Sequence, residues 1–144
     1  MQTTWKAALA IAVLTLVTTV RADTHSTTIQ WASEKWIPVA LSSEGVAITE
    51  VRFEVEGGIH WNPLRAGKGP QAFVNVKNSS DRQMKMAVAV ALFDDKGGLL
   101  GATEASNIGS LDPGEMKEIK LTFREVKRKF FDARTAQLAL ETYK

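Results

Sequence analysis

Residues 58–70, GIHWNPLRAGKGP, contain the densest group of side chains that could do chemistry, among them His60, Trp61 and two cations. The end of this segment, AGKGP, invites comparison with a phosphate-binding P-loop, which has the pattern G-x-x-x-x-G-K-[ST] between a strand and a helix. Asn62 stands at the position of the first glycine of that pattern, and Gly69 replaces its hydroxyl residue. A strand-like segment follows, so no helix N-terminus is available to bind a phosphate. The sequence excludes a P-loop here.

Catalysis and metal binding find little support in the rest of the chain. Its two histidines, His25 and His60, are far apart in sequence, it has no cysteine, and it has neither a G-x-S-x-G motif nor a calcium loop. Acid–base catalysis by paired carboxylates needs a shared cleft, whereas Asp94 and Asp95 are neighbours in a turn and would point apart on a strand-like backbone. We therefore predict that the protein is not an enzyme and uses no metal or cofactor.

The same loop fits recognition better than catalysis. Trp61 offers a large flat surface, Arg65 a planar set of donors and Lys68 a mobile charge, and Trp and Arg are enriched among the residues that dominate binding energy. Long loops between strands are often functional. The alternative is structural: Trp61 folds back over the open end of the fold while Pro63 and Pro70 stiffen the connection. Both interpretations stay open at this point.

A second candidate surface lies on the long apolar segment 83–95. One face of this segment is predicted to be core and consists of Met84, Met86, Val88, Val90 and Leu92. The opposite face, too apolar and too flat for a sheet surface in water, consists of Lys85, Ala87, Ala89, Ala91 and Phe93. We expect another surface to cover it. The candidates are the protein's own Trp31, Trp36 or Phe130–Phe131, and a partner protein docked on an exposed apolar patch. Strand addition by a partner at an open sheet edge is a further route.

Apolar residues recur mostly with a period of two, the pattern of half-buried strands. Residues 23–28 are expected to be an irregular start, and Pro38 is expected to restrict its segment to a sheet edge. The turns DDKGG and LDPGE use glycine where φ is positive. The predicted strands cover 29–41 in two pieces, 46–56, 71–78, 83–95, 99–106, 116–123 and 135–143, with one helical turn in 125–133. About seven short antiparallel strands predict an immunoglobulin-like β-sandwich.

Several short motifs in residues 73–123 form a recognisable series. A strand ends in Lys77-Asn78-Ser79, a long strand ends in Leu92-Phe93-Asp94, a glycine-containing turn follows, and Leu111-Asp112-Pro113-Gly114-Glu115 precedes a closing strand. In these features the chain resembles the FxLYD family of extracytoplasmic immunoglobulin-like domains, although Phe93 stands where that family often has tyrosine. The resemblance implies the same sandwich fold, no catalytic residues, and a module of the cell envelope.

The first 22 residues have the layout of a secretory signal peptide. Lys6 precedes the uncharged, mostly apolar residues 7–20, and Val20-Arg21-Ala22 suits cleavage after Ala22. A retained membrane anchor is the alternative, but these 14 residues rise only about 21 Å as a helix, less than the roughly 30 Å hydrocarbon layer. We therefore predict a signal peptide over 1–22, a single domain over 23–144, and no membrane span after cleavage.

Cleavage changes the charge balance. The whole chain carries 18 basic and 16 acidic residues; Lys6 and Arg21 are lost with the signal peptide and no acid is, so residues 23–144 are formally neutral. Nucleic acid is therefore not an expected partner, because binding it requires a net basic patch. The lack of cysteine and the short signal favour a bacterial periplasm, or secretion, as the location. Asn78-Ser79-Ser80 is a glycosylation acceptor only in a eukaryotic secretory pathway.

These observations favour an exported, non-catalytic binding or protein-interaction module of the cell envelope, with the loop around Trp61 and the alanine face as contact surfaces. The alternative is a domain that binds a small ligand such as a carbohydrate through the 58–70 loop. In that alternative Trp61 would stack on a planar group and Arg65 would hold an anionic one.

Overall fold

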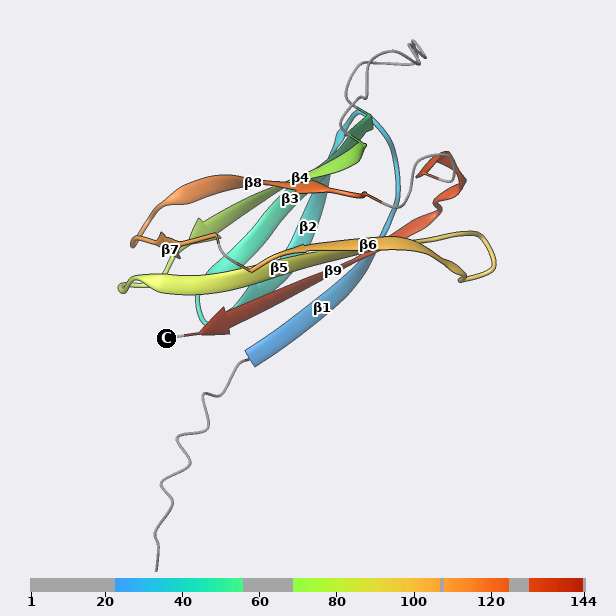
Figure 1. The fold of residues 1–144 in the computed structure, drawn as a ribbon. Coiled ribbons are helices and arrows are strands. Elements are labelled where there is room, and N and C mark those ends of the chain that lie inside the picture. The colour runs from blue at the N-terminus through green and yellow to red at the C-terminus, as the bar shows by residue number, and fades with distance from the viewer. Residues whose placement is uncertain (1–22, 56–68, 107, 125–129, 144) are drawn as a thin grey trace, which may run out of the picture.

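Two antiparallel sheets face each other in the computed structural model, which describes residues 23–55, 69–106, 108–124 and 130–143 (Figure 1). The nine strands in these ranges confirm the predicted all-β sandwich. The segment predicted to be a signal peptide lies outside the described residues, as does most of the 58–70 loop.

Each sheet is built from strands that are distant in sequence. Sheet A has the order β1 (Asp23–Gln30), β9 (Thr135–Tyr143), β5 (Met84–Phe93) and β6 (Leu99–Ala105), and the short β7 (Ser110–Leu111) pairs with the start of β5. Sheet B has the order β2 (Trp36–Ser43), β3 (Val46–Val55), β4 (Pro70–Asn78) and β8 (Met116–Thr122). The chain therefore crosses between the sheets after β1, β4, β7 and β8. The 3₁₀ helix η1 (Phe130–Asp132) lies on the last crossing, within the segment where a helical turn was predicted.

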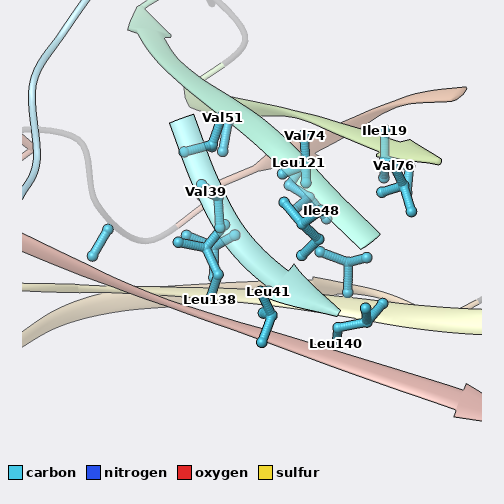
Figure 2. Packing of buried hydrophobic residues seen from close by; sticks show 14 of the residues in the cluster. Val39, Leu41, Ile48, Val51, Val74, Val76, Ile119, Leu121, Leu138 and Leu140 are labelled. Atoms are coloured by element: carbon cyan, nitrogen blue, oxygen red, sulfur yellow. The ribbon is translucent and has the colours of Figure 1, made fainter. Parts of the chain in front are cut away.

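The core lies between the sheets and consists mainly of inward residues of β2, β3, β4, β5, β8 and β9. The predicted core face of β5 is confirmed, because every inward residue from Met84 to Leu92 is at most 1% exposed. Aliphatic side chains of β2, β3, β4 and β8 point toward those of β9 in Figure 2. A polar contact also joins the two sheets, a buried 2.8 Å hydrogen bond between the hydroxyls of Ser43 in β2 and Thr142 in β9. Alternating strands with one buried face each therefore account for the two-layer fold.

The prediction of an irregular start at residues 23–28 is wrong. These residues belong to β1, whose eight residues all pair with β9 without a register shift. The segment has only one aliphatic residue, Ile29, so it lacks the alternating apolar signal of a half-buried strand. Its threonines favour extended backbone, and the neighbouring β9 supplies the pairing that fixes it. The predicted strand around Trp31 is displaced as well, because Trp31 follows β1 and the next strand begins at Trp36.

The two predicted turns have the expected chemistry. Asp94 Oδ1 accepts hydrogen bonds from the backbone N–H groups of Lys96 (2.9 Å) and Gly98 (2.7 Å), and Gly97 adopts a φ of 76° between β5 and β6. Gly114 has a φ of 79°, and Glu115 Oε2 accepts a 2.8 Å hydrogen bond from the backbone of Asp112. Pro38 is exposed in β2, an edge strand with a register shift directly after it, as predicted.

Asn78 is a buried residue whose side chain links the end of β4 to the following turn and to β7. Its side-chain Nδ2 donates to Leu111 O (3.0 Å) and Arg82 O (2.8 Å), and its Oδ1 accepts from the backbone N–H of Ser80 (2.9 Å) and from its hydroxyl (2.6 Å). Asn78 is 0% exposed. A glycan on Nδ2 would replace one of its two hydrogens, break at least one of these bonds and need space at a fully buried atom, so the folded domain does not present the acceptor motif at 78–80.

We predict that Asn78→Ala lowers the free energy of unfolding by about 2–3 kcal/mol, because it leaves the buried carbonyl of Leu111 without this donor and removes the acceptor of two Ser80 hydrogen bonds. Asn75→Ala is the matched control, since the Asn75 side chain is only partly buried and donates to Glu50 at 2.8 Å. We expect the control to cost less than about 1 kcal/mol. Urea unfolding followed by circular dichroism measures both. Equal losses in the two variants would contradict the linking role of Asn78.

Candidate functional site

The outward face of sheet A is the candidate site that the described residues bring together. Ala87, Ala89 and Ala91 lie on this face of β5 and are each partly exposed. Their cross-strand partners extend the same chemistry, because Ala89 pairs with Ala139 of β9 and Ala91 pairs with Ala102 of β6. We name these five residues the alanine strip. Small side chains on three adjacent strands leave the centre of this face flat.

The strip continues toward larger apolar side chains at one end. Phe93 follows Ala91 on the same face of β5, and its register partner on β6 is Leu99. Leu99 is 63% exposed, the largest value among the exposed large hydrophobic residues that the structure describes. Polar residues border the strip, with Glu104 opposite Ala89, Glu141 opposite Ala87 and Lys85 at the other end. The result is an exposed apolar patch with a polar rim.

The tryptophans predicted to cover this face lie elsewhere. Trp31 packs at one end of the sandwich, with ring centroids 5.3 Å from Phe130, 6.4 Å from Phe131 and 6.4 Å from Phe53. Trp36 lies on the outward face of the opposite sheet, beside Arg52. The N-terminal segment joins sheet A as the edge strand β1 instead of lying across it. Covering by Trp31 or Trp36 is therefore wrong, because β1 pairs beside β9 in the plane of sheet A and Trp36 belongs to sheet B.

The outward face of sheet B carries a feature that the sequence analysis missed. Trp36, Arg52, Phe73 and Lys120 are register partners in one row across β2, β3, β4 and β8. The Arg52 guanidinium carbon lies 4.9 Å from the Trp36 ring centroid and 5.0 Å from that of Phe73. Lys120 Nζ lies 5.5 Å from the Phe73 centroid. We name these four residues the cation–aromatic row.

The side chains of the cation–aromatic row contact one another across the strands. The Phe73 ring contacts two cations, Arg52 on β3 and Lys120 on β8. Arg52 lies between the Trp36 and Phe73 rings, and its Nη2 lies 3.3 Å from Glu54 Oε2. Such contacts stabilise each pair by about 0.5–2 kcal/mol, depending on desolvation. The only sequence signal for the row is that aromatic and basic residues alternate with core residues in β2, β3, β4 and β8. The strand register was needed to align them, and periodicity does not supply a register.

A third feature is the open side of the sandwich between the edge strands β6 and β8. Two hollows of about 500 and 470 Å³ lie there and share Glu104 and Lys120 among their lining residues. The gap is bridged by the Thr103 hydroxyl, which donates to Thr122 O at 3.1 Å, and by Lys117 Nζ, which donates to Ile108 O at 2.8 Å. Its lining carries both charges and, among the residues described, no histidine.

The other predicted site residues are not placed. Trp61, Arg65 and Lys68 lie outside the described residues, so the choice between a recognition loop and a structural cap stays a prediction. One end of the sandwich already has an aromatic cap, in which Phe130 packs against Trp31 and Phe123. Within the described ranges there is no cluster of three or more histidine or acidic side chains that could hold a metal. In the same part of the chain, no helix has the length and apolar character needed to cross a membrane.

Comparison with models of known protein families finds no match for this chain, and no curated protein matches it. The resemblance to FxLYD domains therefore stays a prediction from the motifs in residues 73–123. The geometry of the described residues has to carry the functional argument.

We predict that Arg52→Gln lowers the free energy of unfolding by about 1–2 kcal/mol, because two ring contacts lose their cation. A double-mutant cycle with Trp36→Leu should give a coupling energy of about 0.5–1 kcal/mol. Lys85→Gln, which removes an exposed cation from the outward face of sheet A, is the control and should change stability by less than about 0.5 kcal/mol. Zero coupling between Trp36 and Arg52 would show that the row contributes nothing as a pair.

Proposed function

We propose that this protein is an exported, non-catalytic interaction module of the cell envelope that binds a partner protein through the alanine strip on sheet A. The observation that carries the proposal is the flat apolar surface at the centre of a sheet. Ala87, Ala89 and Ala91 are partly exposed there, with Leu99 at one end. Exposed apolar patches with a polar rim are typical of protein–protein interaction sites.

The rigidity of the surface supports the proposal. β5 is hydrogen-bonded to β9 on one side and to β6 and β7 on the other, so the strip sits on the central part of the sheet and not on a loop. Its inward neighbours Val88 and Val90 are at most 1% exposed and anchor it to the core. A preformed surface loses little conformational freedom on binding, and alanine side chains lose almost none.

The outward face of sheet B fits a partner less well. Its Trp36 and Phe73 are residue types found in binding hot spots. Both rings, however, already contact Arg52, so part of their surface is used within the chain. The alanine strip has no comparable contact, since the ring contacts among the described residues all lie elsewhere.

The test places a large charge on the strip. Ala89→Arg should remove binding, because the guanidinium would stand in the middle of the apolar contact and would have to be desolvated. Ala47→Arg is the matched control: Ala47 is also a partly exposed alanine within a strand, β3, but on the outward face of sheet B. Cross-linking in native envelopes identifies candidate partners, and titration with the purified partner measures affinity.

We expect Ala89→Arg to weaken the purified complex by at least about tenfold, equivalent to about 1.4 kcal/mol, and Ala47→Arg to leave it unchanged. Melting temperatures of all three proteins establish that the variants are folded. A partner that binds wild type and Ala89→Arg equally would overturn the strip as the contact surface.

Export can be tested independently of the partner. β1 begins at Asp23, so cleavage after Ala22 would leave this strand whole. The intact mass of the protein recovered from a periplasmic or culture fraction should correspond to a chain that starts at Asp23. A protein that keeps residues 1–22 and stays with the membrane fraction would contradict export by a cleaved signal.

A further inference from the structure

Open sheet edges are the second place where this fold offers contacts to other molecules. Among the described residues, β1 and β6 are the edges of sheet A, and β2 and β8 are the edges of sheet B. An edge strand presents backbone N–H and C=O groups that another strand can pair with, and natural sheets protect their edges with proline, bulges or charged residues.

Three of the four edges carry such protection. β2 has Pro38 with a register shift directly after it. β8 has three charged residues, and one of them, Lys117, turns back to donate to Ile108 O across the open side of the sandwich. β6 has an extra residue between Leu99 and Gly101, where its register with β5 shifts, and it also carries Glu104.

From Thr24 to Gln30, β1 carries no such protection. This part of the strand contains no proline, glycine, lysine, arginine or acidic residue, because the one acid of β1, Asp23, is its first residue, and all eight residues pair with β9 in an uninterrupted register. The Trp31 N–H donates to Arg134 O at 2.9 Å, which continues the same register and sets the direction of the backbone groups. Backbone N–H and C=O groups point to alternate sides along a strand, so those of the odd-numbered residues of β1 point toward β9. The backbone groups of Thr24, Ser26 and Thr28 point away from the sheet.

We propose that a second copy of this chain pairs with this edge, so that β1 and its symmetry mate join two sheets A into one. Antiparallel strands related by a two-fold axis present identical rows of donors and acceptors to each other, so the edge is complementary to itself. Threonine and serine pair favourably across antiparallel strands. Between residues 24 and 30 the only ionisable side chain is His25, so no like charges repel and a charged foreign peptide gains no ion pair.

The symmetry has a consequence for the surface of the dimer. Pairing across a two-fold axis perpendicular to the sheet keeps the same face of both sheets on one side. The two alanine strips would then lie on one continuous outward surface. The dimer can be tested separately from partner binding, because self-association is measured on the purified protein alone.

The first test removes one outward N–H group. Ser26→Pro deletes a donor that faces away from β9, so the pairing of β1 with β9 is kept while the free edge is blocked. Glu104→Pro is the matched control on the other edge of sheet A. The Arg134 N–H donates to Phe93 O, so the backbone groups of Phe93 point toward β9 and those of Val90 point toward β6. Thr103 is the partner of Val90, and the backbone groups of the next residue, Glu104, therefore point away from the sheet.

Sedimentation velocity and light scattering over a range of concentrations should show a monomer–dimer equilibrium for wild type and Glu104→Pro. Ser26→Pro should raise the dissociation constant at least about tenfold, the loss of one or two net hydrogen bonds. A wild type that stays monomeric up to about 1 mM, the range of the weakest measurable association, would overturn the proposal. Equal weakening by Glu104→Pro would overturn it too.

A second test does not depend on how Ser26→Pro folds. The chain has no cysteine, so Ser26→Cys and Glu104→Cys each carry a single exposed thiol on sheet A. A short bis-maleimide should join two copies through position 26 and not through position 104. Failure to cross-link at 26 would rule out the β1 pair. So would cross-linking of position 26 in native envelopes to another protein and not to a second copy.

Discussion

The buried interface between the two sheets is the interaction on which everything else in this fold depends. The chain has no cysteine, so no disulfide can hold the layers together, and stability has to come from packing. Six strands, β2, β3, β4, β5, β8 and β9, each contribute an apolar face to this interface, and the inward residues of β3, β4 and β5 are almost completely buried. Because adjacent side chains on a strand point to opposite faces, burying one set commits the other set to the surface.

The two outward faces show different consequences of this constraint. On sheet B the outward positions hold large side chains that contact each other, and Arg52 lies between the rings of Trp36 and Phe73. On sheet A the outward positions of β5 hold alanines, which have almost no reach beyond the backbone and cannot satisfy each other in this way. Rings that already contact side chains of the same face need no partner, whereas covering a flat apolar face removes apolar surface from water and lowers the free energy. The same physical rule therefore separates a stabilising surface from a candidate contact surface.

The edges of the sheets follow a related logic. A strand in the middle of a sheet has both rows of backbone groups paired, but an edge strand leaves one row to water or to another strand. Proline in β2, the inward lysine in β8 and the bulge in β6 each make a second strand less favourable. β1 lacks all three devices, and half of its side chains carry hydroxyl groups. Both proposed contacts, the alanine strip and the edge of β1, therefore lie on sheet A.

The sequence alone determined the layers, because the period of two in β3, β4, β5, β8 and β9 follows directly from which residues must be buried. It also determined the turns at Gly97 and Gly114, where local backbone geometry decides the conformation. Tertiary structure decided what periodicity does not encode. β1 has too few apolar residues to be recognised, and only pairing with β9 makes it a strand. The row from Trp36 to Lys120 exists only once four distant strands are in register, and Ala102 and Ala139 join the strip of β5 for the same reason. Local patterns record which face of a strand is buried, whereas register and strand order arise from long-range pairing between segments that are far apart in the chain.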